Sequence, residues 1–238
     1  MKNNGFDDVV RVVMEFMNSA VDSTNAKYQQ HLLRSLKHPH ANHSLRMWLS
    51  LLIALGSHGD ENVALTFAGV TPFNQLMHVV QKNAVELAMD DRGVRMVNLV
   101  LTQCPSNPLV GPLLDNLLGS PSILHTLLIH RMANHAIKLA VCIEKERIFR
   151  SVVLHFATVA RDEFGHHVVK KCVQIASSTW LACFTEAFIK HKVELAAEPK
   201  YSKWVRRALA DSLSKNGLSS LVVKLNDSLS SLPMLLSY

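Results

Sequence analysis

The feature that most constrains the fold is a short pattern that recurs along the chain of 238 residues. Each copy has a small residue followed by two residues that are mostly polar, and in four of five copies a cation stands at the fifth position after the small residue. The small residues are Ala41, Gly93, Ala133, Gly165 and Ser202, so the steps between copies are 52, 40, 32 and 37 residues. Helical repeats have periods of roughly 34 to 47 residues. The pattern therefore predicts stacked helical repeats, with an insertion or a degenerate half-repeat in the first step.

The clearest copy lies at residues 162–172. Asp162 can cap the start of a helix, because a carboxylate there accepts hydrogen bonds from free backbone N–H groups. The apolar residues recur at helical spacing and form one stripe: Phe164, Val168, Val169 and Cys172. His166, His167 and Lys170 are expected on a different face. One helix then carries a packing stripe beside a basic, hydrogen-bonding stripe.

Composition favours an all-α chain, because 48% of the residues are hydrophobic and only 6% are aromatic, with few glycines and prolines. We expect a single domain over 1–238, with capping helices at 1–36 and 215–238 and repeat helices at 37–103 and 123–214. The prolines and glycines of 104–122 mark a possible seam. Two longer apolar segments, 71–87 and 148–160, are each expected to form one helix.

The copy at 162–172 carries a family resemblance. Its sequence Asp-x-Phe-Gly-His-His-Val-Val-Lys-Lys resembles the second helix of a Pumilio (PUF) repeat. The frame is less complete at 90–101 and 130–140, and weakest at 38–48 and 199–209. The resemblance implies a right-handed α-solenoid of Pumilio/HEAT-like helical repeats, with about five recognisable repeats and terminal capping helices. It also implies that successive helices face successive RNA bases.

The resemblance places the RNA-facing side chains at the first, second and fifth positions after each small residue. The candidate RNA-binding residues are Asn42, His43, Arg46, Arg95, Asn98, Asn134, His135, Lys138, His166, His167, Lys170, Lys203, Trp204 and Arg207. Base-reading repeats usually have Gln or Glu at the fifth position, whereas four of these five are Lys or Arg. Cations suit phosphate better than a base edge. This resembles the Pumilio-like proteins of ribosome assembly, which bind nucleic acid with little sequence preference.

The net charge of +6 permits an acidic partner such as RNA. We find no catalytic motif, so an enzyme is not expected, and neither is a cofactor. The sequence His38-x-His40-x-x-His43 lacks a fourth metal ligand, so no metal is expected. Asp90 and Asp91 are explained by helix capping rather than by acid catalysis.

Two functions follow from these observations. The first is an RNA-binding protein that holds the RNA backbone within a ribonucleoprotein or a ribosome or rRNA-maturation assembly. Its expected partners are RNA and protein subunits of that ribonucleoprotein. The alternative is a HEAT- or armadillo-type scaffold for protein–protein interaction in a large complex. The longest apolar run is too short to span a membrane, and no signal peptide is visible. We therefore expect an intracellular protein of the nucleus, nucleolus or cytoplasm, with an organelle as the alternative.

Overall fold

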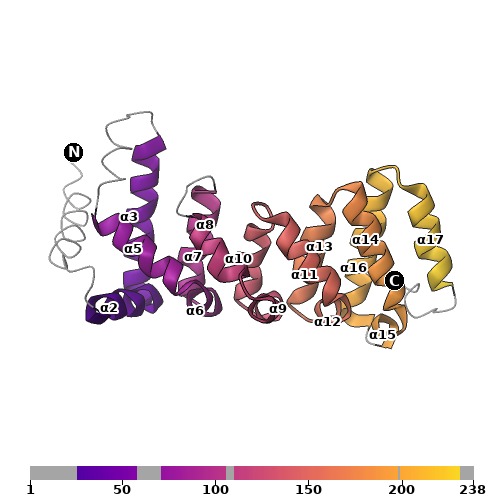
Figure 1. Cartoon of the computed structure of the whole chain (residues 1–238), viewed down its shortest axis with the longest axis horizontal. Helices are drawn as coiled ribbons and strands as arrows, with labels where there is room; N and C mark the ends of the chain where they lie inside the picture. The colour runs from indigo at the N-terminus through magenta and orange to yellow at the C-terminus, as the bar shows by residue number, and fades with distance from the viewer. Residues whose placement is uncertain (1–25, 58–70, 106–109, 198, 231–238) are drawn as a thin grey trace. The chain divides into compact units, whose positions relative to one another are not determined.

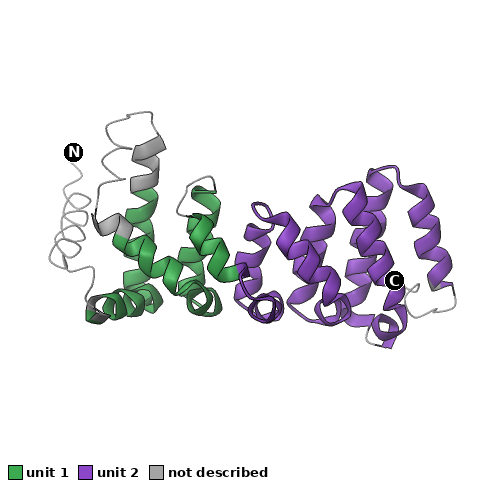
Figure 2. Cartoon of the chain, viewed as in Figure 1, with its two compact units in different colours: residues 1–117 green, residues 118–238 purple. Residues whose placement is uncertain are grey.

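A computed structural model describes residues 26–57, 71–105, 110–197 and 199–230 of the chain. All regular elements within these ranges are α-helices (Figure 1), which confirms the all-α prediction for the part of the chain that the structure describes. The expected capping helices lie partly at 1–25 and 231–238, outside the described residues. The chain divides into two compact units, residues 1–117 (unit 1) and 118–238 (unit 2), as Figure 2 shows. Their boundary lies within 104–122, the stretch in which the sequence places a seam.

The described part of unit 1 contains two inner helices, α3 and α7, which pack against each other. The short helix α6 packs on α7, and α2 packs on α3. The described helices of this unit are α2 (Ala26–Lys37), α3 (Pro39–Ser57), α5 (Thr71–Lys82), α6 (Ala84–Met89), α7 (Gly93–Gln103) and α8 (Val110–Leu118), whose last residue belongs to unit 2.

Unit 2 repeats a motif of three helices: a long outer helix, a short helix and an inner helix. Its inner helices α10, α13 and α16 lie in sequence, since α13 packs against both α10 and α16. The helices are α9 (Pro121–Ile129), α10 (Ala133–Ala140), α11 (Lys145–Leu154), α12 (Phe156–Arg161), α13 (Gly165–Ile175), α14 (Ser178–Lys190), α15 (Lys192–Ala197), α16 (Pro199–Lys215) and α17 (Ser219–Leu229).

Aromatic residues join the outer helix α14 of unit 2 to the outer helix α11 and the short helix α12 of the preceding repeat. Phe149 of α11 packs edge-on against Phe184 of α14, with ring centroids 5.4 Å apart. Phe156 of α12 makes a similar contact with Phe188 of α14, at 6.2 Å. All four side chains are fully buried. Successive repeats therefore share one continuous core, which is how stacked repeats gain stability that a single repeat lacks.

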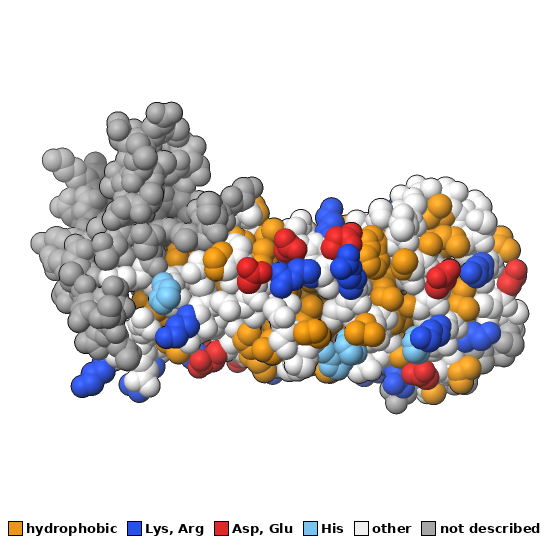
Figure 3. Space-filling model, viewed as in Figure 1, with side chains coloured by type: hydrophobic (Ala, Val, Ile, Leu, Met, Phe, Trp, Pro, Cys, Tyr) orange, Lys and Arg blue, Asp and Glu red, His pale blue; other side chains and the backbone are white. Residues whose placement is uncertain are grey.

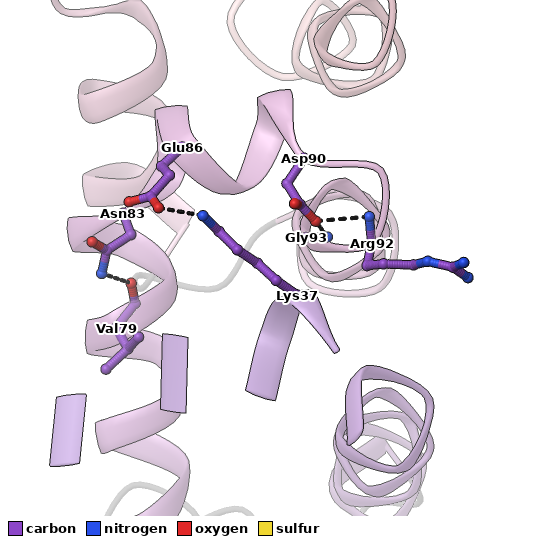
Figure 4. Close-up of polar contacts among 7 residues, drawn as sticks. All are labelled: Lys37, Val79, Asn83, Glu86, Asp90, Arg92 and Gly93. Atoms are coloured by element: carbon purple, nitrogen blue, oxygen red, sulfur yellow. Dashed lines mark hydrogen bonds and ion pairs between the residues drawn. The ribbon is translucent and has the colours of Figure 1, made fainter. Parts of the chain in front are cut away.

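Three breaks between a long and a short helix have nearly the same backbone geometry. Asn83 has φ −110° and ψ 25°, His155 has φ −110° and ψ 27°, and His191 has φ −102° and ψ 17°. The expectation of one helix over 148–160 is therefore wrong, because His155 separates α11 from α12. The expected helix over 71–87 is likewise two helices, separated at Asn83, whose side-chain amide donates to the carbonyl oxygen of Val79 at 2.8 Å (Figure 4).

The turn before an inner helix is closed by a side chain three positions ahead of the small residue. Asp162 Oδ1 accepts hydrogen bonds from the backbone N–H groups of Phe164 at 2.8 Å and Gly165 at 2.7 Å. Asp90 Oδ1 closes the turn before α7 in the same way, accepting from Arg92 N at 2.8 Å and Gly93 N at 2.7 Å (Figure 4). The predicted capping roles of these two aspartates are confirmed.

A histidine closes the corresponding turn before α10. His130 Nδ1 accepts from the N–H groups of Met132 at 3.2 Å and Ala133 at 3.3 Å. The repeat thus keeps one local geometry while the side chain that closes the turn changes from a carboxylate to an imidazole.

The small residue of the pattern is required by a close approach between helices. A Cβ atom added to Gly165 would lie 2.6 Å from the carbonyl oxygen of Val159 in α12, and one added to Gly93 would lie 2.8 Å from the carbonyl oxygen of Leu87 in α6. The contacted atoms are backbone, so they cannot turn aside as a flexible side chain would. The two glycines let the short helix rest directly on the first turn of the inner helix.

Candidate nucleic-acid interface

The residues that follow each small residue differ systematically in exposure. The first position is interior in four copies: Asn42, Asn134 and His166 are only 2%, 2% and 5% exposed, and the apolar Val94 is buried as well. The second position is exposed in all five copies: His43, Arg95, His135, His167 and Trp204. The fifth position is half-buried or exposed in all five: Arg46, Asn98, Lys138, Lys170 and Arg207. The surface a ligand can reach therefore consists of the second and fifth positions, with Lys203 of α16 half-buried beside them.

The interior first-position side chains are already engaged by backbone groups. The amide of Asn42 donates to the carbonyl oxygens of Leu36 at 2.6 Å and Arg92 at 3.1 Å. The amide of Asn134 donates within its own turn, to His130 O at 3.1 Å and Arg131 O at 2.6 Å. These two amide groups hold the fold together, so we leave them out of the ligand-facing surface.

His166 is held in a similar way. Its Nδ1 lies 3.1 Å from the carbonyl oxygen of Asp162, and its ring stacks on Tyr201 of α16 with centroids 5.0 Å apart and an interplanar angle of 22°. Burial is the main cause of a lowered pKa for this imidazole. His166 was expected on the polar face with His167 and Lys170, but the neighbouring helix α16 covers it. Tyr201, which the sequence reasoning missed, precedes the small residue Ser202, as Phe164 precedes Gly165.

Four basic side chains from two neighbouring inner helices form one group, which we call the basic cluster: His135 and Lys138 of α10, and His167 and Lys170 of α13. Within each helix the imidazole lies one turn before the ammonium group, so both pairs face the same way along the helix. Burial lowers the pKa of His135, and Lys138 lowers it further. Burial likewise lowers the pKa of the Lys138 ammonium.

His167 lies on α13, which packs against α10, and the pKa of His167 is lowered. Burial lowers it first, and the positive fields of its neighbours His166, Lys138, Lys170 and His135 lower it further, in that order. The field of Lys138 reaches His167 from the adjacent helix, so α10 and α13 present their basic groups to a common space. Such a concentration of positive charge is the arrangement that attracts an anion.

An exposed aromatic ring extends the basic cluster onto α16. Trp204 is 43% exposed, and the ammonium groups of Lys170 and Lys203 lie 5.8 Å and 5.5 Å from its ring centroid. Exposed contacts of this kind contribute about 0.5–1 kcal/mol each. Three consecutive inner helices of unit 2 thus contribute to one surface that combines cations with rings able to stack.

The carboxylates in the described ion pairs contact cations outside the basic cluster. The described ion pairs join Lys37 to Glu86, Arg150 to Glu146, His191 to Glu194 and Lys224 to Glu186. Lys138, Lys170 and Arg207 form no ion pair with any residue that the structure describes. On the face drawn in Figure 3, acidic and basic side chains are interspersed over unit 2. Lys138, Lys170 and Arg207 are therefore open to an external anion.

The remaining sequence candidates lie in unit 1, on α3 and α7. His43 and Arg95 are exposed, and Arg46 is half-buried. Asn98 is half-buried as well, and its Oδ1 atom is buried without a hydrogen-bond partner. These two inner helices thus repeat the exposure pattern of unit 2 with fewer lysines.

Two other properties bear on function. Among the described residues, no group of three His, Cys, Asp or Glu side chains is arranged to hold a metal ion, the histidines of 38–43 included. No helix within the described ranges is both long enough and apolar enough to cross a membrane.

Comparison with known proteins identifies the fold. No family model matches the chain, and no curated protein matches it. Among solved structures, it is similar to the RNA-binding domain of yeast Puf5p bound to MFA2 RNA, with a TM-score of 0.61 at 14% identity over 85% of this chain and 53% of that one. It is similar to PUF-8 in complex with PBE-RNA, with a TM-score of 0.66 at 14% identity over 92% of this chain and 64% of that one.

A third similar structure is the RNA-binding domain of Puf4 bound to a recognition sequence of HO endonuclease RNA, with a TM-score of 0.63 at 12% identity. That match covers 89% of this chain and 64% of the other. The chain therefore spans between about half and two thirds of the length of these structures. At such low identity the likeness shows the fold alone.

Proposed function

From the Pumilio-type repeat fold that this chain shares with those structures, we propose that it binds RNA through the inner helices of unit 2. The basic cluster, together with Trp204 and Arg207, holds the phosphodiester backbone. Binding has little sequence preference, and it serves a ribonucleoprotein or an assembly that matures ribosomal RNA. The observation that carries the proposal is the group of cations on consecutive inner helices without carboxylate partners among the described residues.

The chemistry at the fifth position favours backbone binding over base reading. An ammonium group is a compact point charge with donors that point in many directions, so Lys138 and Lys170 can donate to any phosphate oxygen within reach. The first position is nearer to the helix start. There, the side-chain amides of Asn42 and Asn134 already donate hydrogen bonds to backbone carbonyls. Few donors and acceptors remain that could distinguish one base from another.

Aromatic stacking adds affinity without adding sequence preference. Base–aromatic stacking contributes about 1–3 kcal/mol per base and tolerates every base, because each has a π face. Trp204 is the largest exposed ring on this surface, and His135 and His167 stand at the equivalent position of the two preceding inner helices. A single strand lying along α10, α13 and α16 would meet one ring and one cation at each helix.

The test is a charge reversal with a matched control. Lys138→Glu/Lys170→Glu should weaken binding of a single-stranded oligonucleotide by at least about 100-fold, since hydrogen bonds to charged groups contribute about 1.5–3 kcal/mol each. The negative slope of the logarithm of the association constant against the logarithm of salt concentration should become shallower by about 1.4. Each phosphate contact accounts for about 0.7 of this slope on a single strand. The control Lys145→Glu/Lys190→Glu makes the same charge change on the exposed outer helices α11 and α14.

The outcomes separate the candidate functions. The control variant should bind nearly as tightly as the wild type, and both variants should keep the far-ultraviolet circular dichroism of a folded helical protein. Equal losses in the two variants would mean that only net charge matters and would refute the assignment of the surface. Negligible affinity for RNA, together with a stoichiometric protein partner recovered after nuclease treatment, would favour the protein scaffold instead.

A further inference from the structure

The basic cluster contains two kinds of positive group, and only one kind is charged at every physiological pH. His135 and His167 are both exposed, they occupy the same position on the neighbouring helices α10 and α13, and each is followed by a lysine one helical turn later. A lysine carries its charge throughout this range, whereas an imidazole changes charge between about pH 5 and 8. The affinity of this surface for an anion therefore depends on how many of its imidazoles are protonated.

The groups whose charges act on the two imidazoles are lysines and other imidazoles. Lys138 acts on His135, and His166, Lys138, Lys170 and His135 act on His167. From α16, the ammonium of Lys203 lies near Trp204, and from α9 the imidazole of His130 closes the turn before α10.

The two carboxylates nearest in the sequence to His167, Asp162 and Glu163, do not act on the imidazoles of the basic cluster. Asp162, in the turn before α13, accepts two backbone N–H bonds, and its field acts on His166 rather than on His135 or His167. Glu163 beside it is exposed, and it contributes to the hydrogen bonding of His166 only through its backbone. No carboxylate of the described chain thus stabilises the protonated form of either exposed imidazole.

We propose that RNA binding at the basic cluster takes up protons at His135 and His167, so that affinity for RNA rises as the solution is acidified below neutrality. This inference rests on the proposed function and adds a means of regulating it. In the free protein, burial and positive neighbours keep both imidazoles neutral near pH 7, since they lower the two pKa values below the ordinary 6.5. RNA phosphates supply the negative charge that the protein does not, and so they favour the imidazolium form.

The pH window follows from this difference between the free and bound states. Above the pKa of the bound imidazole neither state is protonated, and affinity does not depend on pH. Between the bound and free pKa values, each imidazole that gains a proton on binding raises affinity about tenfold per pH unit. Below the free pKa both states are protonated, and affinity reaches a plateau. With two imidazoles, the slope of the logarithm of the association constant against pH should approach a value between about −1 and −2.

The experiment measures affinity of the full chain for a fluorescent oligouridine at constant ionic strength, from pH 8 to pH 5.5. The oligonucleotide carries no terminal phosphate, because a phosphomonoester titrates near pH 6 and would obscure the effect. His135→Gln/His167→Gln removes both rings and should bind more weakly than the wild type at pH 8. Relative to its own affinity at pH 8, it should lose most of the gain that the wild type shows at pH 5.5. His135→Lys/His167→Lys should bind tightly at both pH values, since its charges are fixed.

A control removes two other imidazoles of unit 2. His155→Gln/His191→Gln changes histidines at the breaks between outer and short helices and should retain the wild-type dependence on pH. A wild-type affinity that is measurable but independent of pH would overturn the inference while leaving the proposed function in place. The same holds if the control pair loses the dependence and the cluster pair keeps it. Absence of binding at every pH would overturn the proposed function itself.

Discussion

Replacing Gly165 by alanine should destabilise unit 2, although alanine ordinarily favours a helix. The added Cβ would lie 2.6 Å from the carbonyl oxygen of Val159, 3.0 Å from its Cγ1 and 3.2 Å from Cγ2 of Ile129. Relief requires α13 to move away from α12, because the nearest atom is backbone. Overpacking of this kind costs about 1–3 kcal/mol. At about 2–4 °C per kcal/mol for a chain of this size, the melting temperature should fall by roughly 2–12 °C.

The chain offers a control for the same substitution in open space. A Cβ on Gly111, in the first turn of α8, would meet no described atom within 4 Å. Gly111→Ala should therefore be neutral or stabilising by up to about 1 kcal/mol, because alanine restricts the unfolded chain. Melting followed by circular dichroism at 222 nm would compare the two variants with the wild type. A Gly165→Ala protein as stable as Gly111→Ala would refute the close approach of α12 and α13.

Two further predictions concern local stability. Asp162→Ala should cost about 1 kcal/mol, because the N–H groups of Phe164 and Gly165 lose their acceptor; Asp162→Asn keeps an acceptor oxygen and should recover most of the loss in a urea titration. Acid should destabilise the RNA-free protein, since burial lowers the pKa of His166 in the folded state and the unfolded chain therefore binds more protons. Stability should be constant above about pH 6.5 and fall below it, and His166→Gln should reduce that fall; a melting temperature that rises on acidification would contradict this reasoning.

Local features of the repeat could be predicted from the sequence, because they depend on residues within one helical turn. Asp90 and Asp162 close their turns as expected, and helices α7, α10 and α13 begin at the small residue of the pattern. A cap and the helix that it starts lie three residues apart. Their geometry is therefore contained in a short segment, whatever the rest of the chain does.

The breaks at Asn83 and His155 were not predicted, and the reason is physical. The apolar spacing continues across both, so each segment resembles a single amphipathic helix. Neither break contains the glycine or proline that usually signals one. The backbone at both sites is in a region with negative φ that any residue adopts. Only the packing of the short helix on the inner helix requires the chain to bend there.

The exposure of the polar residues also could not be predicted from the sequence. His166 and His167 are adjacent and chemically identical, yet one is 5% exposed and the other is open to solvent. Successive residues on a helix point about 100° apart, and the sequence does not say where α16 will lie. Tyr201, 35 positions later, covers one histidine and leaves the other.

The first-position residues have a consequence for how the repeats are joined. Asn42 reaches the backbone of Arg92, and His166 stacks on Tyr201. Both partners stand immediately before the small residue of the following repeat. Each contact ties the beginning of one inner helix to the beginning of the next, and so sets the pitch at which outward-facing side chains recur. A mutation at such a joint would alter the fit of a long ligand without removing any group that touches it.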